Sequence, residues 1–173
     1  MHRAATRRFG RVRSRAFSLL ETCAAIALLG TFAAALLATL LYYQELGEKT
    51  TVEMTLLNVR SGIRFEIADK MIHGRTAELD RVLDSNPVNW LESAPPGYVG
   101  ELKDEEIGRV NPGEWFYDTT RRQLGYVPKQ ALHLNLESSG DHALRWRIRG
   151  VRSARGDVED LSLVSVTPYT WFQ

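Results

Sequence analysis

Cysteine is almost absent from this chain of 173 residues, because Cys23 is the only one. With a single thiol no intramolecular disulfide can form, even if part of the chain lies in an oxidising compartment. The sequence also lacks a nucleophile motif, a phosphate-binding loop and an HExxH pattern, and its four histidines have no metal-ligand spacing. We therefore expect a protein that is not an enzyme and that needs no cofactor.

Acidic residues are missing from the first 16 positions, which carry six arginines. Residues 17–173 hold 16 Lys and Arg against 21 Asp and Glu, a net charge of −5. Sequence-independent binding of nucleic acid depends on clustered positive charge, so we do not expect DNA to bind across the surface of this domain. Roughly 130 residues follow the N-terminal segments, which is the size of one small domain.

Charge of either sign is missing from a run of 23 residues, Thr22–Gln44. The 27 residues from Phe17 to Tyr43 would form about 40 Å of helix, whereas a bilayer core is about 30 Å thick. This run is too long for the apolar core of a secretory signal peptide. The arginines before it predict a cytoplasmic N-terminus by the positive-inside rule, and the domain that follows would lie on the other side of the membrane.

One carboxylate, Glu21, stands at the start of the apolar segment, and a plain membrane anchor gives no reason for it. A charge at membrane depth costs about 2.5–3.5 kcal/mol and is a functional hypothesis by default. The surrounding string, Arg15-Ala16-Phe17-Ser18-Leu19-Leu20-Glu21, resembles the class III signal of type IV pilins and type II secretion pseudopilins. In that signal a basic leader and a small residue precede Phe-x-x-x-x-Glu at the start of a long hydrophobic helix.

The resemblance implies a prepilin-like precursor. A prepilin peptidase would cut between Ala16 and Phe17, and Phe17 would then be N-methylated. Glu21 would serve assembly by meeting the Phe17 amine of a neighbouring subunit, since a buried charge is tolerated when it is paired. The chain departs from the family at Ala16, where glycine is usual. It also lacks the disulfide and the mid-helix proline of many major pilins, which favours a minor pilin or a pseudopilin.

The resemblance also implies a location, partners and a domain organisation. The chain would be a single-pass protein of the bacterial inner membrane, with a periplasmic C-terminal domain, until it joins a type IV pilus or a secretion pseudopilus. Its partners would be the prepilin peptidase, other pilin or pseudopilin subunits, an inner-membrane assembly platform and the lipid bilayer. We expect a basic leader at 1–16, a transmembrane and assembly helix at 17–43, and a pilin-like globular domain at 44–173 that includes the C-terminal half of the long helix.

The residues beyond the membrane segment predict an α+β fold. Apolar residues recur every three or four positions and predict that the helix continues to about Ile72: Val52, Leu56, Val59, Ile63, Ile67 and Met71. His73-Gly74 is a helix stop, and Gly47 and Gly62 are weak points within the helix. Short alternating segments after Glu114 predict a small antiparallel sheet packed on the helix, with a hairpin at 115–127, a second hairpin between Leu132 and Ile148, and a last strand at 161–167.

An acidic segment before the last predicted strand is a candidate metal site. Asp157, Glu159 and Asp160 supply three carboxylates, and calcium takes six to eight oxygen ligands. Pseudopilins of secretion systems use an acidic C-terminal loop to bind calcium. The EF-hand pattern is absent here, so a solvated turn is the favoured interpretation and calcium is the alternative.

Three arginines alternate along a predicted strand, Arg145, Arg147 and Arg149, and would project the same way about every 7 Å. The favoured interpretation is an outer face whose charges pair with acids across the sheet. Contact with a neighbouring subunit or with DNA phosphates is the alternative. The last possibility leads to a rival function, a monomeric membrane-anchored periplasmic module that binds a ligand or DNA through this arginine-rich strand.

Overall fold

The computed structural model describes residues 18–136, 142–152, 158–166 and 168–172. The chain divides into two compact units, residues 1–41 and residues 42–173. A single helix, α1 (Leu19–Ile72), contributes residues to both. The predicted processing residues Ala16 and Phe17 and the candidate metal ligand Asp157 lie outside the described residues, and nothing is described of the Glu159 side chain.

Helix α1 ends where the sequence predicted. Its C-terminus is closed by two hydrogen bonds, from Gly74 N to Met71 O at 3.2 Å and from Arg75 N to Lys70 O at 2.8 Å. This is the pattern of a Schellman motif, and Gly74 has the left-handed conformation, φ 67°, that the motif requires. The prediction of a stop at His73-Gly74 is therefore confirmed, and so is the end of the helix at Ile72.

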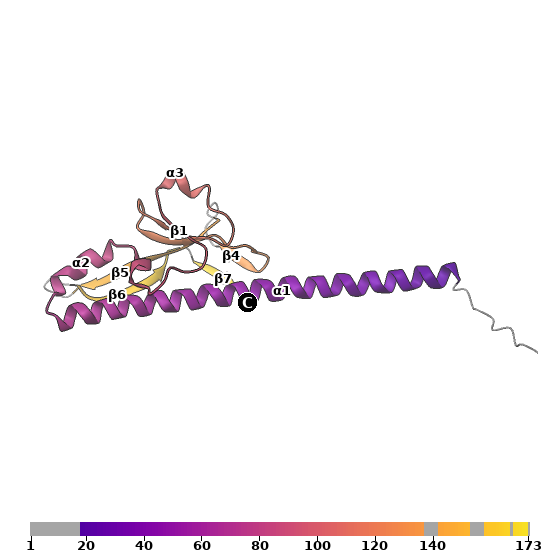
Figure 1. The fold of residues 1–173 in the computed structure, drawn as a ribbon, viewed down its shortest axis with the longest axis horizontal. Helices are drawn as coiled ribbons and strands as arrows, with labels where there is room; N and C mark the ends of the chain where they lie inside the picture. Colours follow the sequence, from indigo (N-terminus) through magenta and orange to yellow (C-terminus); the bar gives the residue numbers. More distant parts are fainter. Residues whose placement is uncertain (1–17, 137–141, 153–157, 167, 173) are drawn as a thin grey trace, which may run out of the picture. The chain divides into compact units, whose positions relative to one another are not determined.

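The second unit packs a five-stranded sheet along the C-terminal half of α1 (Figure 1). The strand order is β1-β2-β3-β5-β6, formed by β1 (Tyr98–Leu102), β2 (Trp115–Asp118), β3 (Gln123–Tyr126), β5 (Leu144–Arg152) and β6 (Val158–Ser165). Short helical segments join α1 to the sheet or interrupt the strands: η1 (Thr76–Glu78), α2 (Leu79–Leu83), η2 (Pro87–Trp90) and α3 (Asp104–Ile107). The α+β class is confirmed.

The sheet differs from the prediction in two ways. Strand β1 pairs in parallel with β2, so the sheet is mixed and not purely antiparallel. The expected hairpin between Leu132 and Ile148 is wrong, because β4 (Leu134–Leu136) pairs with β7 (Tyr169–Trp171) in a separate two-stranded sheet. Strand β1 was not predicted at all, and for β4 and β5 the alternation indicated strands but did not specify their partners.

The core lies between α1 and the five-stranded sheet. The α1 residues that the 3.6-residue period assigned to the core are buried, except Met71, which is 47% exposed: Val52, Leu56, Val59, Ile63 and Ile67. Across from them the sheet contributes Leu124, Leu144, Trp146, Leu161 and Leu163. Full burial of such a side chain stabilises by about 1.5–3 kcal/mol, so this stripe explains why the second half of so long a helix is stable.

Candidate functional site

Glu21 caps the N-terminus of α1. The Ser18 amide donates to Glu21 Oε2 at 2.8 Å, and the Glu21 amide donates to Ser18 Oγ at 3.2 Å. This reciprocal pair is a capping box, which satisfies two backbone donors that a helix start otherwise leaves unpaired. The sequence pattern Ser-x-x-Glu directly before an apolar run predicts this capping box, but it was not recognised from the sequence.

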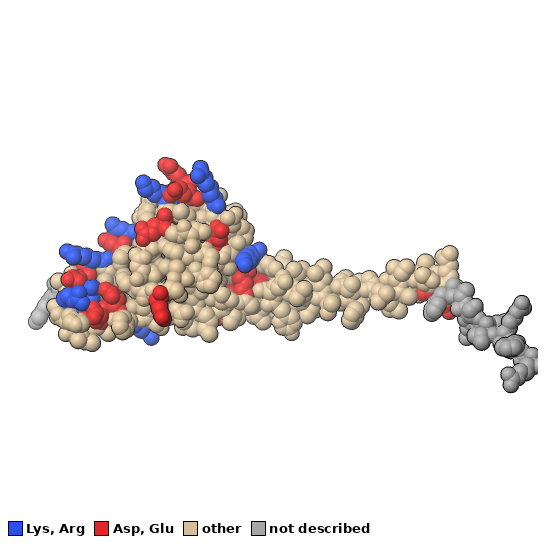
Figure 2. Space-filling model, viewed as in Figure 1, with Lys and Arg blue, Asp and Glu red and all other residues tan. Residues whose placement is uncertain are grey.

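The described part of the first unit is a helix whose apolar side chains are exposed. Leu19 is 83% exposed, Leu28 is 73% and Phe32 is 69%. Figure 2 shows the same stretch of α1 free of Lys, Arg, Asp and Glu beyond its first turn. This helix is long and apolar enough to cross a membrane. Left in water it would expose a row of large apolar groups, so its surface requires lipid or other helices.

Glu45 is a fully buried carboxylate at the beginning of the second unit. Its Oε1 accepts hydrogen bonds from the His133 amide at 2.8 Å and from Trp171 Nε1 at 3.1 Å, and its Oε2 lies 2.8 Å from His133 Nδ1. A carboxylate has only acceptors, so Nδ1 carries the proton. Burial would raise the pKa of Glu45, but the hydrogen bonds from His133 and Trp171 outweigh it and hold the pKa below its ordinary value.

Glu48, one turn further along α1, holds the segment that leads to β4. Its Oε1 accepts from the Tyr126 hydroxyl at 2.7 Å and from the Lys129 amide at 2.6 Å, and its Oε2 accepts from the Gln130 amide at 3.2 Å. Burial raises the pKa of Tyr126, and the neighbouring Glu48 carboxylate raises it further, so the hydroxyl remains a donor. Glu45 and Glu48 thus fasten α1 to the chain segments around β4 and β7.

Sequence reasoning missed both glutamates. Glu45 lies seven residues before Val52, so it falls on the same stripe of α1 as the core residues. The sequence prediction of the stripe included only its apolar members and assigned no role to Glu45. A buried polar residue on an apolar stripe predicts a partner, although it does not say which segment supplies it.

An aromatic cluster adjoins Glu45. The Tyr42 ring makes edge contacts with His133, at a centroid distance of 5.5 Å, and with Phe172, at 5.3 Å. The His133 and Phe172 rings stack at 4.8 Å. Phe172 has a positive φ of 59°, which is uncommon for a bulky residue and costs free energy. The ring contacts and the Phe172 amide bond to the His133 carbonyl, 3.1 Å long, hold it there.

The three alternating arginines of β5, Arg145, Arg147 and Arg149, do not form one exposed row. Arg147 and Arg149 are exposed, but Arg145 is 6% exposed and its Nη1 lies 3.3 Å from Oδ2 of the buried Asp118. Its guanidinium also covers the Phe116 ring, at 5.5 Å from the centroid. The expected pairing with an acid across the sheet is confirmed for Arg145, but its place on an outer face is wrong, because the residue is buried. Because Arg145 is buried, it cannot belong to a continuous row of exposed arginines that contacts phosphates.

Asp160 is the one candidate metal ligand whose side chain is described. Asp160 is exposed and its Oδ1 accepts from the adjacent Leu161 amide at 2.9 Å. Among the residues that the structure describes, no group of three or more His, Cys, Asp or Glu could hold a metal ion. Since Asp157 and the Glu159 side chain are not described, calcium binding by the acidic segment stays a prediction.

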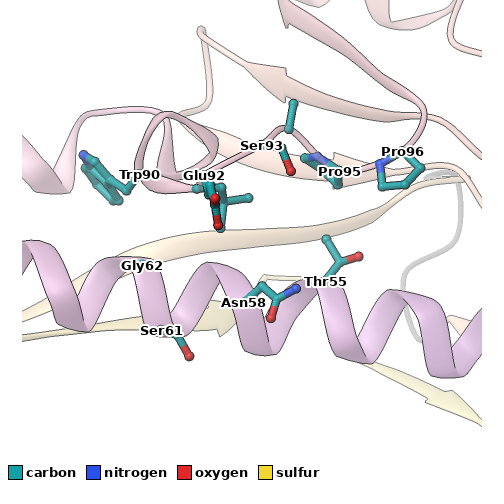
Figure 3. A pocket seen from close by; sticks show the side chains of 11 residues that line it. Thr55, Asn58, Ser61, Gly62, Trp90, Glu92, Ser93, Pro95 and Pro96 are labelled. Carbon is teal, nitrogen blue, oxygen red and sulfur yellow. The ribbon is translucent and has the colours of Figure 1, made fainter.

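A groove of about 410 Å³ lies between α1 and residues 90–96 (Figure 3). Of the described residues that line it, Glu92 is the only ionisable one, and the others include Thr55, Asn58 and Ser61. Gly62 permits this close approach, because a Cβ there would lie 3.1 Å from the Trp90 carbonyl oxygen. Gly62 is therefore a packing position as well as a weak point of the helix.

No protein-family model, curated protein or solved structure matches this chain.

Proposed function

We propose that this chain is a structural subunit, a minor pilin or a pseudopilin, of a type IV pilus or a type II secretion pseudopilus. The observation that carries the proposal is the junction at the start of α1, where Ala16-Phe17 precedes Glu21 and a charge-free helix. The exposed apolar surface of α1 and the α+β layout of the second unit support it.

The apolar half of α1 would work in two environments. Before assembly its leucines and phenylalanines face lipid, and after assembly they face the helices of other subunits. Transfer from lipid to a protein interior changes little hydrophobic free energy, so helix packing and hydrogen bonds decide the outcome. One surface can therefore serve both states without refolding.

Glu21 would provide the specific contact of assembly. After removal of residues 1–16, the Phe17 α-amino group begins the chain one helical turn from Glu21. Glu21 Oε2 accepts from the Ser18 amide, and among the described residues Oε1 has no hydrogen bond. Oε1 would accept from the Phe17 amine of the next subunit, which pairs two charges that are costly alone at membrane depth.

The proposal is tested by the intact mass and first residue of the membrane-extracted protein, made with and without the prepilin peptidase. We expect a peptidase-dependent start at Phe17 with an added methyl group of about 14 Da. Ala16→Gly restores the residue usual in the family and should be processed faster than the natural chain. A chain that begins at Met1 in the presence of active peptidase would refute the proposal, provided that an authentic prepilin is cut in the same cells.

A further inference from the structure

A second exposed apolar surface lies on α1 within the second unit, on the side opposite the core. Met54, Leu57, Phe65 and Ile72 are 59%, 53%, 77% and 80% exposed. With about 150–200 Å² for each full side chain, they expose on the order of 400–550 Å² of apolar surface. The largest apolar patch of a typical monomer is about 300–600 Å² and is often an interaction site.

The exposed residues on this side follow the spacing of a coiled coil. Steps of four and three residues alternate along one seam, and every member is exposed: Met54, Asn58, Ser61, Phe65, Ala68 and Ile72. In heptad terms Asn58, Phe65 and Ile72 take position a, and the other three take position d. The small side chains of Ser61 and Ala68 would let a partner helix approach closely. In Figure 3 the Ser61 side chain points away from residues 90–96, so that segment does not cover it.

Asn58 indicates what kind of helix completes the seam. A polar asparagine at a single a position lowers the stability of a coiled coil but selects a two-stranded, in-register arrangement. Its amide can donate to and accept from the same amide of a second chain. A second copy of this chain therefore satisfies Asn58, whereas an apolar partner would leave it unpaired.

The charges beside the seam are also self-complementary. Arg64 takes position g and Asp69 position e, on opposite flanks. In a parallel pair, position g of one helix lies beside position e five residues later on the other, which brings Arg64 of each copy to Asp69 of the second copy. Asp69 already accepts from Arg75 Nη2 at 2.6 Å, and a carboxylate has room for further donors.

We propose that residues 54–72 of α1 bind a second copy of the chain as a parallel, in-register, two-fold pair. Two copies would bury about 800–1,100 Å² of apolar surface, which is near the lower limit for a specific interface. A two-fold contact joins the same residues of both copies, whereas filament contacts join different surfaces with an axial offset. The pair is thus distinct from the filament contact and does not depend on the proposed function.

Cross-linking of the full chain in membranes tests this pairing. In a Cys23→Ala background, Ser61→Cys places a thiol in the seam, and Glu53→Cys places one on an exposed flank. Mild oxidation should convert the Ser61→Cys protein to a disulfide-linked dimer at least fivefold faster than the Glu53→Cys protein. Equal rates, which indicate random collision, or no dimer through residue 61 would overturn the proposal.

A second variant separates pairing from folding. Phe65→Glu, added to the Ser61→Cys protein, should reduce the cross-link at least fivefold and leave the unfolding transition unchanged, because Phe65 is 77% exposed. Val99→Glu, at an exposed apolar residue of β1, is the matched control and should not affect the cross-link. Cross-linking that resists Phe65→Glu, or that falls equally with Val99→Glu, would also overturn the proposal.

Discussion

At the scale of single residues, three glutamates of α1 differ because their donors differ. Glu21 accepts from the helix start, Glu45 from His133 and Trp171, and Glu48 from Tyr126 and two backbone amides. For the buried Glu45, these donors hold the pKa below its ordinary value, so it stays ionised where water is excluded. The residue type is the same in all three cases, so the surrounding donors decide whether the carboxylate caps the helix or holds distant segments against it.

Capping and assembly by Glu21 can be separated by substitution. Glutamine also fits the capping box, so Glu21→Gln should keep the helix start and membrane insertion but remove the charge that, in the proposed assembly, would pair with the Phe17 amine. We expect at least a tenfold loss of the subunit from sheared filaments, measured by immunoblot against the membrane fraction.

Ser18→Ala provides the reverse test, since it removes the capping hydroxyl and leaves the charge. It should cost about 1 kcal/mol of local helix stability and still permit assembly. If Ser18→Ala blocked assembly and Glu21→Gln did not, Glu21 would be a helix cap and no more.

Glu45→Ala should destabilise the second unit strongly. It leaves the His133 and Trp171 donors without their acceptor in a buried site, which costs about 2–4 kcal/mol in the free energy of unfolding. Glu53→Ala, which removes an exposed carboxylate paired with Lys49, should cost less than about 1 kcal/mol. Urea unfolding followed by tryptophan fluorescence measures both, and equal losses would mean that Glu45 is not the fastening residue.

The contribution of Glu45 should also depend on pH. Its pKa in the folded chain lies below the ordinary value of 4.5, so the stabilisation is complete above about pH 4.5 and is lost as the pH falls through the folded pKa. The natural chain should therefore lose more stability between pH 6 and pH 3 than Glu45→Gln does. Parallel losses in the two proteins would contradict this account.

At the scale of elements, α1 could be predicted almost completely from the sequence. Its apolar period, its stop at Gly74 and its charge-free first half are local patterns, and local patterns determine helix boundaries. The hairpin of β2 and β3 was predictable for the same reason, because a short turn joins its strands.

Contacts between distant parts of the chain could not be predicted in this way. The parallel pairing of β1 with β2, the pairing of β4 with β7 and the bonds of Glu45 each join segments that no local pattern links. Arg145 illustrates the limit, since strand alternation predicted its side of the sheet but not the burial against Asp118 and Phe116. Side-chain partners across a sheet depend on register, and register emerges only with the whole fold.

The two glycines of α1 in the second unit should respond oppositely to alanine. Nothing lies within 4 Å of a Cβ built at Gly47, so Gly47→Ala should stabilise by about 0.5–1 kcal/mol through helix propensity. At Gly62 the new Cβ would lie 3.1 Å from the Trp90 carbonyl oxygen, so Gly62→Ala should give no gain or a loss. Equal stabilisation in urea unfolding would show that residues 90–96 do not pack on α1 as described.

At the scale of the whole molecule, the chain joins two units with different solvent requirements. The first unit exposes apolar side chains that need lipid or other helices, and the second has its own core and mixed surface charge (Figure 2). A chain of this kind is incomplete as a free monomer in water. In the proposed assembly, α1 of neighbouring subunits would supply this environment, and the second unit would remain at the surface.

Recovery of the chain from assembled filaments tests this account most directly. Filaments sheared from cells that carry the natural chain should contain it, beginning at Phe17, and the same preparation from cells without the prepilin peptidase should not. If the chain stayed entirely in the membrane fraction while other subunits were assembled normally, it would be an anchored domain and not a filament subunit.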